Sequence, residues 1–188
     1  MVAAGSLVSL GLSMHETLAH QLEMWHEFYL LIGTAGVTLT GLLFVVVSLG
    51  PRVVAENQAT GVRSFISPNA VYFTTTLVVS AVFLVPDLSP AAIGTLLCVG
   101  GVGSLGYLAY TKVHQRWRRN KLPLLDWIWF VGLPIVGYVL LVISGIGFFM
   151  QVAMSAHGVA VALILLLVIG IRNAWDLVLW ISQKEHKR

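Results

Sequence analysis

Long apolar segments alternate with short polar ones along nearly the whole chain. A helix that crosses a membrane needs about 20 predominantly apolar residues, and the segments recur at this length. Polar breaks fall at 50–51, 86–87 and 151–157, and Ser-Pro pairs at 67–68 and 89–90 are typical helix starts. The pattern predicts five membrane-spanning helices, at about 28–49, 68–85, 90–110, 124–149 and 158–182.

A helical extension is predicted before the first span. Ser13 followed by Glu16 forms a capping-box pattern, and no helix breaker follows until Gly33. We therefore expect a tail over 1–13, an external helical extension over 14–27 that continues into the first span, and a cytoplasmic tail over 183–188. The expected fold is an all-α integral membrane protein, a single membrane domain over 1–188 with a bundle of five transmembrane helices.

Composition supports this class. The chain of 188 residues is 57% hydrophobic and 10% charged, whereas soluble domains carry about 25% charged residues. The basic residues lie in short connections between spans, which argues against a nucleic-acid-binding patch. Cys98 is the single cysteine, so an intrachain disulfide is excluded.

The basic residues predict an orientation. Five of them lie between Lys112 and Lys121, after the third span. Because cytoplasmic loops are enriched in Lys and Arg, this connection is expected inside. Alternation of the spans then places all eleven Lys and Arg on the inner side, and Asp87 and His157 outside. We expect a multi-pass protein of the cytoplasmic (inner) membrane, with its N-terminus outside and its C-terminus cytoplasmic.

Carboxylates and a histidine share one edge of the first helix. A helix advances about 100° per residue, so an i, i+4, i+7, i+11 spacing keeps four side chains within an arc of about 60°. The candidate ion-pathway or metal residues are Glu16, His20, Glu23 and Glu27, then Thr34 and Thr38 on the same line, and His157 from the last span.

Three interpretations of this edge are open. It is a solvated polar face, the outer mouth of an oligomeric cation pathway, or a divalent metal site. Helical bundles build di-metal sites from Glu-x-x-His units, whereas His20-x-x-Glu23 has the reverse order and no second unit occurs. This argues against an enzyme, and no catalytic residue is predicted. No cofactor is expected, apart from the possible divalent metal.

Two further patterns lie inside the spans. Arg172 and Asp176 are spaced i, i+4 near the inner end of the last span, and Asp126 begins the fourth, so these three form a candidate inner-side polar group. Gly100-x-x-x-Ser104 is a small-xxx-small match, which predicts that span 90–110 is the most closely packed, either inside the protomer or between protomers. Pro134 predicts a kink in the fourth span.

Residues Thr38–Leu49 resemble a segment of small, uncharacterised multi-span bacterial membrane proteins. The resemblance covers about one span and implies a bacterial cytoplasmic membrane, but no activity. Two function classes lead: an oligomeric cation or proton channel or carrier, and a non-catalytic accessory or scaffold subunit of a larger membrane complex. A metal-binding membrane protein is the third. The expected partners are the lipid bilayer and either further copies of the chain or other membrane proteins.

Overall fold

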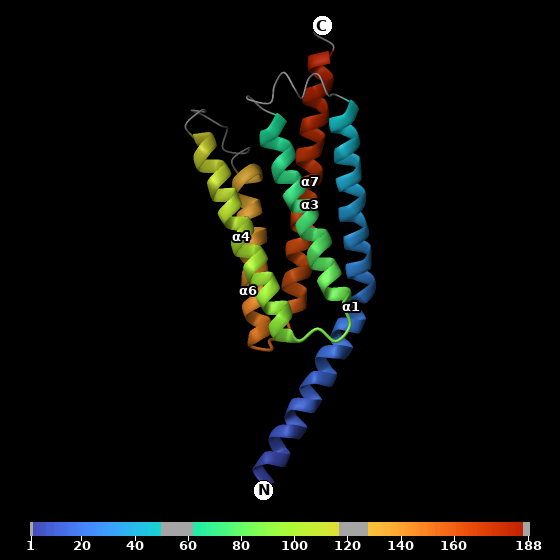
Figure 1. Cartoon of the computed structure of the whole chain (residues 1–188), viewed down its shortest axis with the longest axis vertical. Coiled ribbons are helices and arrows are strands. Elements are labelled where there is room, and N and C mark those ends of the chain that lie inside the picture. Colours follow the sequence, from blue (N-terminus) through green and yellow to red (C-terminus); the bar gives the residue numbers. More distant parts are fainter. Residues whose placement is uncertain (1, 50–61, 117–127, 186–188) are drawn as a thin grey trace.

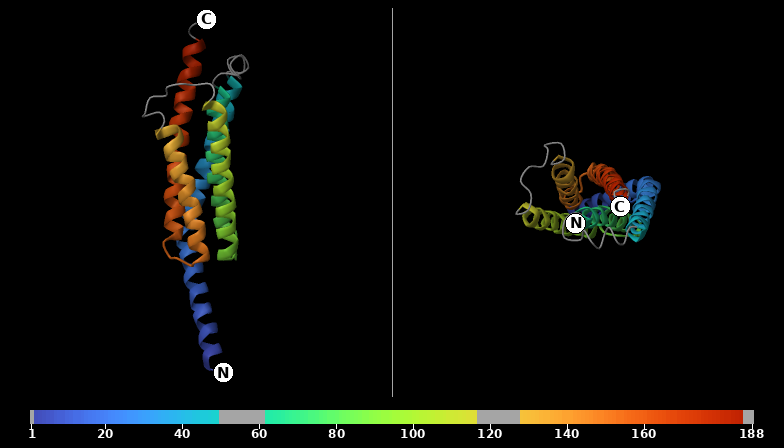
Figure 2. Two further views of the ribbon diagram at one scale, coloured as in Figure 1. Left: turned by 90° about the vertical axis from the view of Figure 1, so that its left-hand side faces the viewer. Right: turned by 90° about the horizontal axis from the view of Figure 1, so that it is seen from above.

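The computed structural model describes residues 2–49, 62–116 and 128–185, with side chains for 24–48, 68–111, 128–179 and 182. All regular structure in these ranges is helical, which confirms the all-α prediction for this part of the chain. The elements are α1 (Val2–Leu49), α3 (Val62–Leu84), α4 (Pro90–Arg116), the π-helix η1 (Ile128–Gly132), α6 (Leu133–Phe149) and α7 (Ser155–Glu185). The helices lie side by side and alternate in direction, and α1 extends past the others at its N-terminal end (Figure 1, Figure 2).

Four helices are long and apolar enough to cross a membrane. They are Met24–Ser48 of α1, Pro90–Thr111 of α4, Ile128–Phe149 across η1 and α6, and Ser155–Leu179 of α7. The apolar part of α3, Pro68–Leu84, is shorter. By length and composition, the described ranges therefore hold four candidate spans and one shorter apolar helix.

The helix starts agree with the Ser-Pro pattern at one position and differ at another. Ser89 caps α4, which begins at Pro90, and the Ala92 N–H donates to the Ser89 Oγ at 3.2 Å. In contrast, α3 begins at Val62, so Pro68 lies inside the helix. Proline removes one backbone N–H, but the turns on either side keep their own bonds and the helix continues.

The first helix also begins earlier than the capping-box pattern indicates. α1 begins at Val2, not at Ser13. Residues 2–12 contain no proline, and Ala and Leu, which favour helices, recur among them. The extension over 14–27 is thus part of one helix that continues without a break into the first candidate span.

Pro134 lies next to a local departure from α-helical geometry in the fourth span, a π-helix, and the kink itself stays a prediction. Pro134 lies in the first turn of α6, directly after η1. Proline has no N–H to donate to the carbonyl one turn earlier, and a π turn is a common local adjustment of an apolar helix.

α7 is the central helix of the bundle. Of its most apolar 18-residue window 56% is buried, against 22–33% for the other three candidate spans. α3 and α6 pack on α7, α1 packs on α3, and α4 packs on α6 (Figure 2). α3 and α4 touch little, although they follow one another in the chain.

Within the protomer, span 90–110 is not the most closely packed, because only one side of α4 is packed; close packing of this span between protomers stays a prediction. A Cβ added to Gly94 would lie 2.8 Å from the carbonyl oxygen of Gly145 on α6. A Cβ added to Gly101 would lie 2.6 Å from the Cγ2 of Val142. The glycines on the other side of α4 meet nothing within 4 Å. Small residues thus lie on two sides of α4, and within the protomer only the side with Gly94 and Gly101 contacts another helix.

An aromatic cluster joins four helices at the end of the bundle where the turns 85–89 and 150–154 lie. The ring of Tyr29 on α1 stacks on Phe83 of α3 with centroids 4.2 Å apart. Phe83 packs edge-on against Phe148 of α6 at 5.6 Å. The Tyr29 hydroxyl donates to the carbonyl of Ala156 on α7 at 3.3 Å.

Candidate functional site

The predicted polar edge of α1 faces away from the bundle. Glu27 has a side chain that is 90% exposed, and Thr34 and Thr38 are also exposed. A Cβ added to Gly41, one turn further along, would meet nothing within 4 Å. We call these four residues, Glu27, Thr34, Thr38 and Gly41, the α1 edge.

The opposite side of α1 makes the contact with α3. A Cβ on Gly33 would lie 3.0 Å from the Cβ of Ser80, and one on Gly36 would lie 3.1 Å from the carbonyl oxygen of Phe73. The position of the α1 edge follows from this contact, because the two glycines turn the threonine side of the helix outward.

The threonine hydroxyls of the α1 edge bond within their own helix. Thr34 Oγ1 donates to the Leu30 carbonyl at 2.8 Å, and Thr38 Oγ1 donates to the Thr34 carbonyl at 2.9 Å. Such i−4 bonds satisfy the hydroxyl without any outside partner. The threonines are therefore compatible with lipid, with a partner helix or with an aqueous path.

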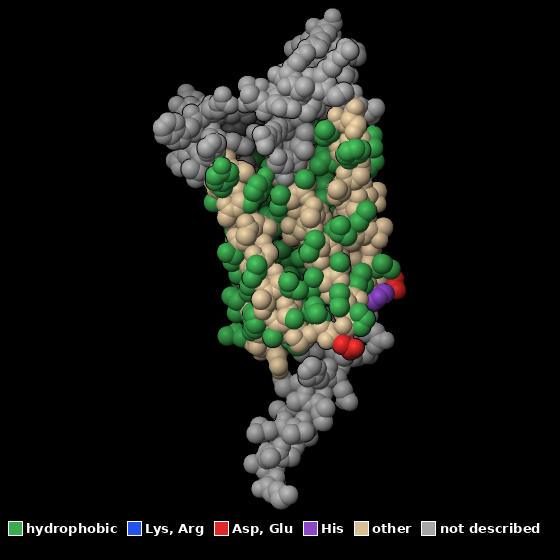
Figure 3. Space-filling view, in the orientation of Figure 1, with side chains coloured by type: hydrophobic (Ala, Val, Ile, Leu, Met, Phe, Trp, Pro, Cys, Tyr) green, Lys and Arg blue, Asp and Glu red, His purple; other side chains and the backbone are tan. Residues whose placement is uncertain are grey.

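The acidic end of the edge is described only in part. Glu16, His20 and Glu23 belong to α1, but their side chains lie outside the described residues. Glu27 lies beside His26, whose Nδ1 is 3.8 Å from the Glu27 Oε1, with 55% of the His26 side chain exposed. Figure 3 shows acidic and histidine side chains at one end of the described surface and hydrophobic side chains over most of the rest.

The described side chains contain no complete set of ligands for a metal ion. Among them, no group of three His, Cys, Asp or Glu lies close enough to hold a metal ion. A site built from Glu16, His20 and Glu23 falls outside this part of the chain and stays a prediction.

His157 comes to α1, where it contacts an aromatic residue. Its ring packs edge-on against Trp25, with centroids 4.8 Å apart and an interplanar angle of 84°. Trp25 also packs edge-on against Phe28 at 5.3 Å. His157 thus extends the aromatic cluster and joins the start of α7 to α1.

Arg172 makes its described contact with an aromatic ring. Its Cζ lies 4.1 Å from the ring centroid of Trp129 on η1, a cation–π geometry. Between the described side chains of Arg172 and Asp176 there is no ion pair. Asp126 lies outside the described residues. The arginine therefore joins α7 to the π-helix.

A groove between α3 and α4 was not predicted. It has a volume of about 490 Å³ and is lined by aliphatic side chains, with Leu141 of α6 among them and Gly100 and Ser104 from α4. Thr75, also in its lining, has its Oγ1 3.3 Å from the Tyr138 hydroxyl. The threonines and glycines that line the groove can be seen in the sequence. The groove itself could not be predicted, because it forms where α4 packs on α6 and contacts α3 only weakly.

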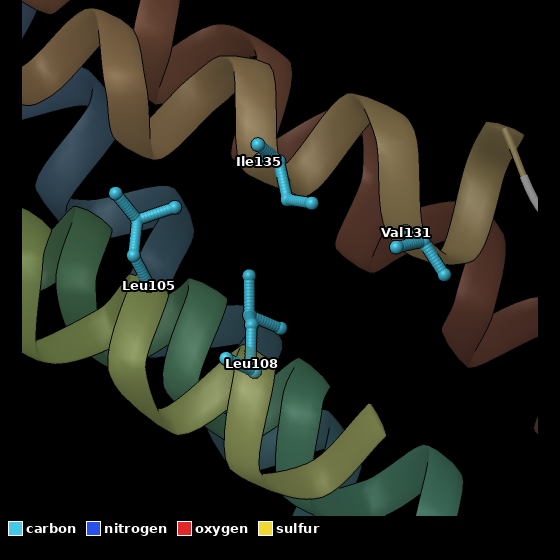
Figure 4. A pocket seen from close by; sticks show the side chains of 5 residues that line it. Leu105, Leu108, Val131 and Ile135 are labelled. Carbon is cyan, nitrogen blue, oxygen red and sulfur yellow. The ribbon is translucent and has the colours of Figure 1, made fainter. Parts of the chain in front are cut away.

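A smaller crevice of about 260 Å³ lies between α4 and the η1–α6 segment (Figure 4). Leu105 and Leu108 face Val131 and Ile135 across it, and Ala109 completes the lining. These side chains are aliphatic, so they offer packing and no chemistry.

No family model, curated protein or solved structure matches the chain. Function must therefore be argued from the geometry of the described residues. Two outward surfaces stand out: the α1 edge, and the three exposed glycines of α4, Gly100, Gly103 and Gly106, which we call the α4 face.

Proposed function

We propose that the chain is a multi-pass membrane protein that acts as a non-catalytic accessory or scaffold subunit and binds partner helices within the bilayer. Its apolar surface supports this proposal. Leu31, Phe44 and Val99 are 68%, 73% and 67% exposed in the protomer. Monomeric soluble proteins rarely expose large contiguous apolar patches, so lipid or a partner is the natural environment of this surface.

The α4 face is the observation that carries the proposal. Gly100, Gly103 and Gly106 are exposed, and a Cβ at any of them would meet nothing within 4 Å. In membranes, small residues let two helix backbones approach closely, which is how dispersion contacts can hold helices together in lipid. Glycine weakens a helix by roughly 1 kcal/mol relative to alanine, so an unpacked series is costly unless something uses it.

The proposed topology has five crossings, in which α3 crosses the membrane together with the four candidate spans. α3 connects the end of α1 at one end of the bundle to the start of α4 at the other (Figure 1). It has 23 residues, or roughly 35 Å at 1.5 Å per residue. Its apolar part, Pro68–Leu84, covers roughly 26 Å of the ~30 Å hydrocarbon thickness, so the proposed crossing places its first turns at headgroup level. With the basic connections inside, the N-terminus lies outside a bacterial cytoplasmic membrane and the C-terminus lies in the cytoplasm.

A second candidate function is an oligomeric cation or proton channel or carrier. The outward direction of the α1 edge favours it, because copies that associate through α1 would bring Glu27, Thr34 and Thr38 around a shared axis. Carboxylates at such a mouth concentrate cations. The two candidates thus differ in the helix that makes the contact: α4 for a scaffold and α1 for a pore.

A matched pair of leucine substitutions separates the two proposals. Gly103→Leu and Gly41→Leu each fill an exposed position with nothing within 4 Å, so neither is expected to disturb the protomer. The mass of the complex extracted from the native membrane is measured by native mass spectrometry. We expect Gly103→Leu to release the chain from its partners and Gly41→Leu to leave the complex intact.

The other outcomes are equally informative. Release by Gly41→Leu alone supports the channel and contradicts the scaffold. If both variants keep the native mass, neither surface binds a partner and both proposals fail. Circular dichroism of each purified variant establishes that the helices are retained.

Two cysteine variants test the orientation. Ala153 and Ser182 are exposed; Ala153 lies in the turn before α7, and Ser182 lies near its C-terminal end. In a Cys98→Ala background, we expect Ala153→Cys to react with an impermeant maleimide in intact cells, and Ser182→Cys to react only after lysis. The reverse pattern contradicts the orientation, and labelling of both positions in intact cells contradicts a crossing by α7.

A further inference from the structure

Two amide side chains that are buried in the bundle have polar atoms without hydrogen-bond partners. Asn69 on α3 has 0% of its surface exposed, and Asn173 on α7 has 3%. The unpartnered atoms are the Nδ2 and Oδ1 of Asn69 and the Oδ1 of Asn173. Buried polar atoms in native proteins are almost always hydrogen-bonded, to protein or to ordered water, so these three atoms indicate a missing bonding partner.

Helix register places the two asparagines at one level of the bundle. A Cβ added to Gly170 of α7 would overlap the ring of Phe73, so these two residues mark where α3 and α7 touch. The two helices run in opposite directions (Figure 1). Asn69 comes four residues before Phe73, and Asn173 comes three after Gly170. At 1.5 Å per residue, both lie roughly 5–6 Å from the contact, toward the same end.

The two side chains also face the same interface. Residues four apart lie on one side of a helix, so Asn69 shares the side of Phe73 that packs against α7. Asn173 comes three residues after Gly170, so the two residues share one face of α7, the face that meets Phe73. Between these turns, two primary amides are enclosed by apolar helices and have three bonding atoms to satisfy.

We propose that Asn69 and Asn173 together bind one buried water molecule between α3 and α7. A buried water makes about three hydrogen bonds to otherwise unsatisfied groups. Here it accepts from the Asn69 Nδ2 and donates to the Oδ1 of each asparagine, which satisfies all three atoms. The two amides do not bond to each other directly, since all three atoms lack a hydrogen-bond partner in the structure. A cation would coordinate both oxygens and leave the Nδ2 donor without an acceptor.

The proposed water makes the contacts between α3 and α7 differ in kind on the two sides of Phe73. Toward the aromatic cluster, α3 and α7 are joined through Tyr29 of α1, whose ring stacks on Phe83 and whose hydroxyl donates to the Ala156 carbonyl. Toward Asn69 and Asn173 it is joined through an exchangeable molecule. The water therefore allows the two helices to separate at this level without breaking a protein–protein hydrogen bond.

The first test is a double-mutant cycle on the full-length protein in detergent or nanodiscs, with Asn69→Leu, Asn173→Leu and the double variant. Each single variant leaves the other amide buried without its bridge, so its melting temperature falls by several degrees. The double variant removes all three unpartnered polar atoms and melts no lower than either single variant. Additive losses would overturn the proposal. Ser80→Ala removes another unpartnered buried oxygen on α3 and, as the control, adds independently to Asn69→Leu.

The second test detects the water directly, and it applies to the unaltered protein if a variant does not fold. X-ray radiolytic footprinting oxidises buried side chains only where a bound water supplies the hydroxyl radical. Phe73 is 0% exposed and Phe83 is 6% exposed, so without a water Phe73 should be oxidised no faster than Phe83. We expect severalfold faster oxidation of Phe73, and its loss in Asn69→Leu. Equal or slower oxidation of Phe73 overturns the proposal, as does a melting temperature that rises specifically with added Na⁺ or K⁺.

Discussion

Gly94 and Gly100 lie on the same helix and make opposite contacts, so one substitution tests the packing of α4. A Cβ added to Gly94 would lie 2.8 Å from the Gly145 carbonyl oxygen and 3.0 Å from the Phe149 Cε2. The carbonyl is backbone, so α4 and α6 must separate to admit a methyl group. A Cβ added to Gly100 meets nothing within 4 Å. Gly94→Ala is therefore the perturbation and Gly100→Ala is its matched control.

The two variants share one contribution to stability, so the difference between their free energies of unfolding gives the cost of overpacking at Gly94. Both substitutions gain the same helix propensity, about 1 kcal/mol. Only Gly94→Ala carries the cost of overpacking, typically about 1–3 kcal/mol. The free energies of unfolding of the two variants should therefore differ by about 1–3 kcal/mol, with Gly94→Ala the less stable. At about 2–4 °C per kcal/mol for a chain of this size, the melting temperatures should differ by about 2–12 °C.

The chain contains its own reporter for this measurement. Cys98, its single cysteine, lies on α4 between Gly94 and Gly101, and its Sγ is 3.7 Å from the Val142 carbonyl of α6. When α4 leaves α6, the thiol becomes accessible to a maleimide dye, so fluorescence on heating follows that separation. If Gly94→Ala melts at or above the temperature of Gly100→Ala, the close α4–α6 approach is wrong.

Three other substitutions test separate features. Trp129→Leu removes the ring under Arg172 and should lower the free energy of unfolding by about 0.5–2 kcal/mol. The maleimide dye on Cys98 measures this change, and unchanged stability would mean that the contact has no energetic role. Thr38→Val should change stability by no more than about 0.5 kcal/mol, because the hydroxyl bonds only its own helix; a larger loss would reveal an unseen partner. Under the channel proposal, the double variant Glu23→Gln with Glu27→Gln should lower cation flux into liposomes compared with the unaltered protein. Equal flux in the two proteins would remove these carboxylates from any ion path.

The helical class could be predicted from the sequence because it depends on composition and segment length alone. An 18-residue apolar window is apolar in any fold, and Ser89 caps α4 through a local bond to Ala92. The start of α3 was less predictable. A proline at a helix start and a proline inside a membrane helix look alike in sequence, and the turns before Pro68 decide between them.

The division of the small residues could not be predicted. Gly100 and Gly101 are adjacent and identical, yet the first meets nothing within 4 Å and the second would overlap Val142. This difference depends on which helix lies beside α4, and that helix is α6 and not its chain neighbour α3. The same holds for Asn69 and Asn173, whose shared level depends on the contact of Phe73 with Gly170. Periodicity identifies a helix edge, but tertiary contacts determine whether it faces inward or outward.

The central position of α7 has a consequence for how the protein is made. Ribosomes synthesise α7 last, yet α3 and α6 both pack on it. Until it emerges, the chain holds two helix pairs, α1 with α3 and α4 with α6, that have little contact with each other. A premature stop before Ser155 would leave these pairs inserted but unjoined, a substrate for membrane quality control. The same organisation suggests that residues 1–85 and 86–188, expressed as separate polypeptides, would reassemble around α7 in the membrane.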